Sequence, residues 1–485
     1  MAKKKLQSIN YTSRDFESIR EDLETFARRY YPDTYKDFNE ASFGSLMLDT
    51  VSYVGDILSF YLDYQANESF LDTAMEYNNV VKLARQFGFK LNTNPSTFGL
   101  LTFYLKIPAT LNGVGPDTAY APVLEAGSEF SSTAAGFYTL IDNVDFGASS
   151  NQVVVGTVND TTGVPTSYIV RAQGRAVSGQ LATETYEIGD FERFRKITLA
   201  ADFINSIVRV TDREGHDYVE VDNLSQNIVF KAIRNTTTSR ATVPNILKAV
   251  PVARRYTTEY KAGKTQIQFG YGSTNELLTD SVVDPTNLVL DLSGRSYVTD
   301  TNFDPTKLIS GDKFGIGPAN TTLTVAYRQN TTVDANAAVN TITKPGRIVF
   351  KFSNPSSLLK PTRASVVGSL EVTNEEPFVG SVSLPSSEEV KHRVYGYYAA
   401  QNRAVTLEDY KALVYGMPTK FGSIRRAQVV RDFDEFKRNL NLYLISENTS
   451  GKLVATNQLL KNNVRNWILQ HKMINDTVDI LDAQI

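Results

Sequence analysis

Residues 43–65, FGSLMLDTVSYVGDILSFYLDYQ, decide the N-terminal fold because their polar residues repeat every seven positions. Three serines and three aspartates recur at this spacing: Ser45, Ser52, Ser59, Asp49, Asp56 and Asp63. On an α-helix both rows fall on one polar strip. The remaining surface is apolar over about 200°, against the roughly 100° stripe of an ordinary surface helix. We therefore predict a helix over 42–65 that is clasped from two sides in left-handed, coiled-coil-like packing.

A second helix is predicted just before this one. Its apolar residues follow at spacings of three and four: Phe16, Ile19, Leu23, Phe26 and Tyr30. Thr12 is the expected N-cap, with Asp15 at the third position and Tyr11 packed on Phe16, and Pro32 is expected to end the helix.

These two helices carry more apolar surface than they can bury between themselves, so we predict that they bind other chains. The expected contact residues are Phe16, Ile19, Leu23, Phe26, Tyr30, Met47, Val51, Val54, Leu58, Tyr61 and Tyr64. A third helical segment is predicted over 68–87, with Gly88 at its C-cap. Residues 1–95 together are expected to form a helical assembly domain.

The character of the sequence changes at 92–95, NTNP. From there to about residue 385, short alternating runs are separated by turn-forming residues, as at 100–107, 152–158, 206–210, 218–221 and 322–327. This pattern is typical of an all-β region. Its length suggests two β-rich modules, which we place at 96–250 and 251–385.

Helical signals return at Ser386, where 386–389, SSEE, is a capping box, and again at Thr406. Strands are then expected at 424–430 and 440–446, a helix at 457–471 and a last strand at 477–485. This order suggests a small α+β domain over 386–485 that continues beyond the end of this chain. The predicted fold class is thus multidomain α+β, with an N-terminal helical bundle, central all-β modules and a C-terminal small α+β domain.

Composition excludes several kinds of protein. The chain has 485 residues, enough for about three domains or more. It has no cysteine, which removes disulfides and thiolate metal sites. A net charge of -3 does not favour a nucleic-acid binder. No window reaches the roughly 20 apolar residues of a membrane-spanning helix, so no such segment is expected.

No motif in the sequence predicts catalysis, a cofactor or a metal. His216, His392 and His471 stand apart from any metal-type spacing. The acidic residues of 432–435, DFDE, suit a hairpin turn better than a cation loop. Gly263-Lys264-Thr265 lacks the upstream glycine of a phosphate-binding loop and precedes an alternating, strand-like run.

Four segments in order resemble baseplate J-like proteins of contractile phage tails: 42–74, 267–272 (IQFGYG), 323–328 (LTVAYR) and 404–410 (AVTLEDY). Within that family, the size and long N-terminal helices resemble the wedge subunit of T-even-type bacteriophages. The resemblance implies a non-enzymatic structural protein of the virion, a late gene product assembled in the bacterial host cytoplasm. It also implies two conformers per wedge, joined to another wedge protein through a helical core bundle. The C-terminal domains would join copies into a ring around the hub.

We therefore expect a structural component of a baseplate wedge, whose partners are a second copy of itself, other wedge proteins, and the hub or adjacent wedges. An alternative is a carbohydrate- or receptor-binding tail protein that uses the aromatic, Asn- and Thr-rich β region. A glycoside hydrolase with paired carboxylates is a third hypothesis, and no local motif supports it.

Overall fold

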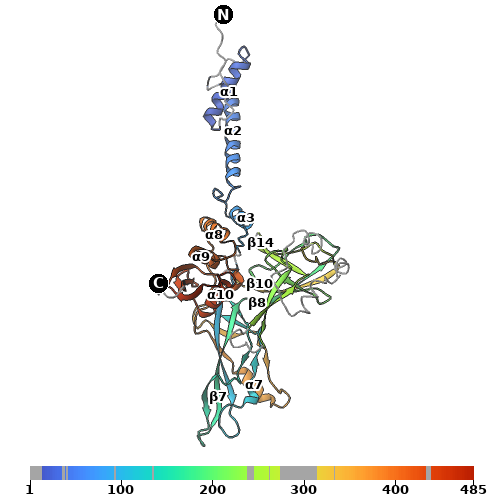
Figure 1. The fold of residues 1–485 in the computed structure, drawn as a ribbon, viewed down its shortest axis with the longest axis vertical. Helices are drawn as coiled ribbons and strands as arrows, with labels where there is room; N and C mark the ends of the chain where they lie inside the picture. The colour runs from blue at the N-terminus through green and yellow to red at the C-terminus, as the bar shows by residue number, and fades with distance from the viewer. Residues whose placement is uncertain are drawn as a thin grey trace. The chain divides into compact units, whose positions relative to one another are not determined.

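The computed structural model describes residues 14–34, 39, 42–91, 94–133, 136–236, 245–261, 263–273, 314–332, 334–432 and 439–484. The chain forms two compact units. One contains Met1–Leu91 with Pro385–Ala399, and the other contains Asn92–Leu384 with Ala400–Ile485. The predicted fold class is confirmed: helices come first, β-sheets occupy the middle of the chain, and mixed helices and strands follow (Figure 1).

Helices build the first unit, and their positions agree closely with the sequence periodicity. Their bounds are α1 Phe16–Tyr30, α2 Phe43–Asn67, α3 Tyr77–Gln86 and α8 Ser387–Ala400, whose last residue belongs to the other unit. Asp15, and not the expected Thr12, caps α1, because its carboxylate accepts a hydrogen bond from the Ser18 amide at 3.2 Å. Tyr11 and Thr12 themselves lie outside the described residues.

The end of α3 follows the prediction. Gly88 adopts φ +84°, and its amide donates to the Arg85 carbonyl at 3.0 Å. The Phe89 amide donates to the Ala84 carbonyl at 3.1 Å, which completes a Schellman motif. The helix itself is shorter than the predicted 68–87, because residues 68–76 form turns before it.

The first sheet of the second unit has the strand order β17-β3-β4-β7-β1-β19, with β6 paired to β7. Its strands are β1 Phe98–Pro108, β3 Glu129–Ser132, β4 Phe137–Leu140, β6 Gln152–Val158, β7 Pro165–Ser178, β17 Ile342–Pro345 and β19 Glu371–Thr373. All its pairings are antiparallel, and β1 runs beside β7 from Phe98↔Val177 to Pro108↔Ser167.

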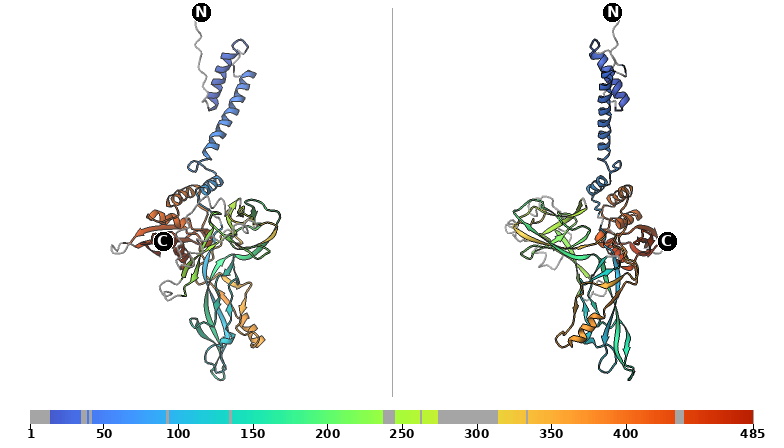
Figure 2. Two further views of the ribbon diagram at one scale, coloured as in Figure 1. Left: turned by 45° about the vertical axis from the view of Figure 1, so that its right-hand side comes forward. Right: turned by 180° about the vertical axis from the view of Figure 1, so that it is seen from behind.

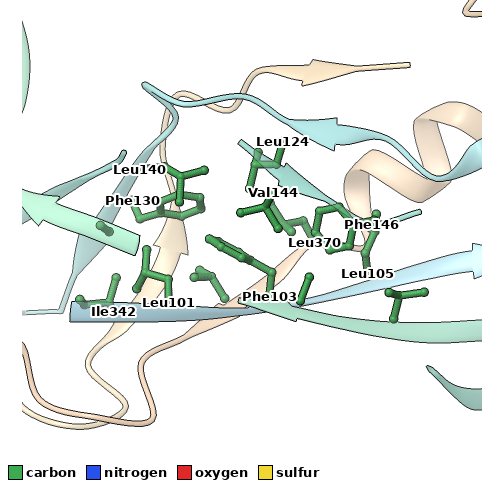
Figure 3. Packing of buried hydrophobic residues seen from close by; sticks show 14 of the residues in the cluster. Leu101, Phe103, Leu105, Leu124, Phe130, Leu140, Val144, Phe146, Ile342 and Leu370 are labelled. Atoms are coloured by element: carbon green, nitrogen blue, oxygen red, sulfur yellow. The ribbon is translucent and has the colours of Figure 1, made fainter. Parts of the chain in front are cut away.

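Alternate residues of β1 point into the core of this sheet. Leu101, Phe103, Leu105 and Ile107 are fully buried. Figure 3 shows Phe103 among Phe130, Leu140 and Val144, and the Phe103 and Phe130 rings are 5.2 Å apart. Three short strands pack nearby, β2 Val123–Leu124, β5 Val144–Asp145 and β18 Phe350–Lys351. Helix α7, Lys360–Gly368, lies within the region predicted to be all-β and was not expected.

The second sheet has the order β8-β16-β10-β11-β14-β15-β9, and its pairings are antiparallel except β11 with β14. Its strands are β8 Gln180–Ile188, β9 Lys196–Thr198, β10 Ile204–Thr211, β11 Asp217–Glu220, β14 Arg255–Lys261, β15 Lys264–Phe269 and β16 Thr321–Gln329. A separate two-stranded ribbon joins β12 Ile228–Arg234 to β13 Asn245–Pro251.

This sheet departs from the expected division near residue 250. β8 at 180–188 pairs with β16 at 321–329, so strands on both sides of residue 250 share one sheet. The whole second sheet is inserted in the sequence between β7 and β17 of the first sheet. Pairing between distant strands depends on tertiary packing, which the local alternation of residues does not encode.

Residues 400–485 form the predicted β-β-α-β arrangement with one short strand added. The elements are α9 Leu407–Tyr415, β20 Arg426–Arg431, β21 Asn439–Glu447, β22 Leu453–Val454, α10 Gln458–Leu469 and β23 Thr477–Asp482. Thr406 and Asp409 form a capping box at the start of α9. Most of α8, which was expected to belong here, is part of the first unit, because Val390 and Val394 pack with Val80 and Ala84 of α3.

Candidate functional site

Helix α1 lies beside α2 (Figures 1 and 2). Ion-pair and hydrogen-bond contacts place it on the polar strip of α2. Arg20 of α1 places its Nε 2.6 Å from an Asp49 carboxylate oxygen and donates from Nη2 to Ser45 Oγ at 3.1 Å. Arg14, just before α1, pairs with Asp63 at 2.7 Å near the other end of the strip. The two helices therefore run antiparallel and meet through charged and hydroxyl groups of α2.

Small residues allow α1 to approach this strip closely. Ser45 and Ser52 are buried, and no other residue of α2 is. A Cβ placed on Gly55 would lie 3.2 Å from Ile19 Cδ1, so the Ile19 side chain packs directly over that glycine. Of the predicted contact residues in α1, Phe16, Ile19 and Leu23 are half-buried, whereas Phe26 and Tyr30 are exposed.

The apolar side of α2 is open to solvent in the single chain. Its exposed large side chains are Phe43, Leu46, Met47, Val51, Tyr53, Val54, Leu58, Phe60, Tyr61 and Leu62. Leu58 is 58% exposed and Tyr61 is 62% exposed, although an ordinary helix turns such residues toward its own core. The five predicted contact residues Met47, Val51, Val54, Leu58 and Tyr61 all belong to this set.

Tyr64, the remaining predicted residue, is half-buried at the end of α2. Its hydroxyl donates to Glu76 at 3.3 Å. Desolvation, together with the Glu76 and Glu68 carboxylates, raises the pKa of Tyr64, so the phenol stays protonated as the donor.

The turn after α2 is held by one buried carboxylate. Glu68 accepts hydrogen bonds from the Met75 amide at 2.7 Å and from Asn79 Nδ2 at 2.9 Å. Beyond the turn, Lys391 of α8 donates to the Asp72 carbonyl at 3.0 Å. A buried apolar cluster also holds this turn against α3 and α8. It consists of Leu71, Ala74, Val80, Ala84, Phe89, Val390 and Val394. The C-terminal end of α2 is thereby fixed within the first unit.

The three helices with this geometry match a known family. The sequence model for "Bacteriophage baseplate protein, N-terminal domain" matches residues 15–86, from the N-cap of α1 to the last residue of α3. Residues 15–86 are thus similar to the N-terminal domain of a bacteriophage baseplate protein. The match supports a structural role in a baseplate and a place in the virion tail. The baseplate J-like resemblance of the segments beyond residue 86 stays a prediction.

Two solved structures resemble the whole chain weakly. One is the cryo-EM structure of the anti-feeding prophage baseplate, at 10% identity and a TM-score of 0.23, covering 96% of this chain and 79% of the other. The other is the TssK-TssF-TssG baseplate subcomplex of the type VI secretion system, at 9% identity and a TM-score of 0.26, covering 89% and 95%. TM-scores this low do not establish a shared fold, and no curated protein matches the sequence.

Beyond residue 86, the fold brings His216 close to two carboxylates that sequence spacing did not single out. Its Nδ1 lies 3.0 Å from Asp212 and 3.5 Å from Glu214, in the hairpin between β10 and β11. Asp212 also accepts from the His216 amide at 2.8 Å, as a turn-forming aspartate does. His471 instead packs on Trp467, with its Nδ1 3.0 Å from the Asn402 carbonyl.

The remaining candidates for chemistry occupy structural positions. Gly263 turns the chain from β14 into β15 with φ +82°, and the Lys264 ammonium pairs with Asp202 at 2.7 Å. Asp434 and Glu435 of the acidic cluster lie outside the described residues. In the part of the chain that the structure describes, no helix is long and apolar enough to cross a membrane.

Proposed function

We propose that the chain is a non-catalytic structural component of a contractile-tail baseplate wedge, assembled through helix α2. The observation that carries this proposal is the row of exposed apolar residues on α2, within the segment that matches a baseplate domain. Contiguous apolar surface of this kind on a folded chain is typical of a protein interface.

The partners that bind the apolar surface of α2 in this proposal are a second copy of this chain and a different wedge protein. The apolar arc spans about 200°, which is more than one neighbouring helix covers. α1 already covers the polar strip, so the neighbours must approach from the other two sides. The seven-residue period favours helices of the partners running beside α2 with coiled-coil-like packing. Such a bundle would transmit force between wedge and hub when the tail contracts.

Two charge insertions test this surface. Leu58→Asp and Tyr61→Asp place a carboxylate in the middle of the exposed face, where burial against a partner would leave it unpaired. We expect either variant to be excluded from baseplates formed by co-expression with the other tail proteins. Asn78→Asp, at an exposed position of α3, adds the same charge elsewhere in the unit and should assemble normally.

Hydrogen exchange of the strands between 98 and 373 must match the wild type in all three variants, which separates lost assembly from lost folding. Incorporation of both α2 variants at wild-type levels would refute the proposal. A glycan array probed with the full-length chain tests the alternative function, since only a carbohydrate-binding β region would retain specific glycans.

A further inference from the structure

The last strand of the chain leaves one side of its backbone open. β23 pairs with β21 in parallel, from Asn439↔Thr477 to Leu444↔Asp482. Among the described residues, no strand pairs with its other side. The amides and carbonyls along this edge can therefore receive another extended chain.

A groove of about 320 Å³ lies between β23 and α10. One wall is formed by Arg465, Ile468 and Leu469 near the end of α10 and by Lys472, three residues beyond the helix. The other wall is 477–480 of the strand. Leu469 is half exposed here, and Ile468 and Ile480 form the buried floor. Side chains of an added strand would thus find an apolar slot.

The helical wall of the groove carries positive charge that no acid of the described chain neutralises. Arg465 is exposed and makes no ion pair with any described residue. The Lys472 ammonium donates to the Asp476 carbonyl at 2.6 Å, a neutral acceptor. Asp479 is the acid lining the groove, and it accepts from Asn439 Nδ2 at 2.6 Å. A bound segment that carries a carboxylate would complement this wall.

We propose that the edge of β23 binds an extended segment of a partner protein, which adds as a further strand to the sheet. Alternate apolar side chains of that segment enter the groove, and an acidic side chain pairs with Arg465. A second copy of this chain fits less well. Two copies paired edge to edge with antiparallel β23 strands would put both α10 helices on one face of the joint sheet, bringing Arg465 and Lys472 of both copies together.

The test is selection of random ten-residue peptides on the immobilised full-length chain. We expect the selected peptides to alternate apolar residues and to carry Asp or Glu. Arg465→Glu and Leu469→Glu should each weaken their binding about tenfold or more, equivalent to about 1.4 kcal/mol. Asn466→Glu, on an exposed position of α10 outside the groove lining, should leave binding within about twofold of the wild type.

Amide exchange identifies the binding mode. A bound peptide should slow exchange in 477–482 and leave the strands of the other sheets unchanged. The proposal fails if no peptide is enriched on the wild type relative to Leu469→Glu. It also fails if the enriched peptides bind without protecting β23, or if Arg465→Glu leaves their affinity unchanged. Concentration-dependent self-association abolished by the same two variants would favour a second copy instead and would overturn the proposal.

Discussion

The Nε atom of Arg20 on α1 lies 2.6 Å from the carboxylate of Asp49 on α2, within the row of aspartates that repeats every seven residues. The same guanidinium reaches Ser45 Oγ, one turn earlier. α1 therefore takes the polar side of α2 and leaves most of its large apolar side chains in solvent. This arrangement reverses the usual amphipathic packing. The apolar side of α2 is therefore accessible to other chains.

The seam between α1 and α2 depends on a small residue at position 55. Gly55→Leu would drive a side chain into Ile19, whose Cδ1 lies 3.2 Å from the Cβ position. We expect α1 to lose about 1–3 kcal/mol of docking free energy through this overpacking. Hydrogen exchange of residues 16–30 in the isolated chain measures this loss of docking free energy. Thr50→Leu, an exposed position on α2, serves as the control. Unchanged protection of α1 in Gly55→Leu would contradict the observed packing.

The exposed face of α2 should make the purified chain self-associate. We expect sedimentation to show a mass that rises with protein concentration, and a larger mass when other tail proteins are added. Leu58→Asp should raise the self-association Kd about tenfold or more, or about 1.4 kcal/mol. Because the contact is apolar, added salt should not weaken it. A monomer at every concentration, alone and in mixtures, would argue against α2 as an assembly element.

Gly88 should resist substitution by alanine. Its φ of +84° closes the Schellman motif after α3, and a left-handed conformation costs an L-residue roughly 1–2 kcal/mol. The added methyl group would meet only Tyr397 at 3.9 Å, so the cost arises in the backbone. We expect a lower unfolding temperature for the first unit in Gly88→Ala. Gly368→Ala should not lower stability, because φ is not positive there and the added methyl group would meet no atom within 4 Å outside its own helix backbone and chain neighbours.

Acid should weaken the second sheet through Glu184. Desolvation raises the pKa of this carboxyl, but hydrogen bonds from Tyr186, Tyr327 and the amides of Ala200 and Ala201 outweigh it and leave the pKa lowered. A lowered folded pKa stabilises the protein above the unfolded pKa of about 4.3. That stability is lost as pH falls through the folded value.

Glu184→Gln should therefore reduce the free energy of unfolding at pH 7 by about 1–3 kcal/mol and flatten its decline below about pH 4.3. Chemical denaturation between pH 7 and pH 3, followed by exchange of the second sheet, measures both effects. Glu187→Gln, exposed on the same strand, is the matched control. If the free energy of unfolding falls equally steeply with acid in Glu184→Gln and in the wild type, the Glu184 carboxyl does not cause the acid sensitivity.

Individual helices and strands were the part of the fold that could best be predicted from the sequence. The seven-residue repeat predicted a helix over 42–65, and α2 runs from Phe43 to Asn67. The alternating run at 152–158 is β6, and Thr406 caps α9 as expected. Each of these depends on residues a few positions apart, so the order of side chains carries the information. The cap of α1 was wrong by three residues because Thr12 and Asp15 are both good caps, and only the folded geometry selects between them.

One property of the candidate site could also be predicted from the sequence. The width of the apolar arc predicted that more than one neighbour covers α2. Leu58 and Tyr61 are exposed in the single chain, and their contact with partners stays a prediction. The sequence did not predict that α1 contacts the polar strip, because Arg20 and Asp49 are 29 positions apart and no periodicity links them. The approach of His216 to Asp212 and Glu214 likewise requires the hairpin between β10 and β11.

The sequence by itself determined the helical front of this protein, the alternating strands behind it and the excess of apolar surface on one helix, since these follow from side-chain order over a few turns. Only the tertiary structure decided that α1 covers the polar strip of α2, that one β-sheet is inserted in the sequence of another, and that β23 has one edge unpaired among the described strands. These outcomes depend on competing contacts between segments tens to hundreds of residues apart, whose relative free energies no local pattern records.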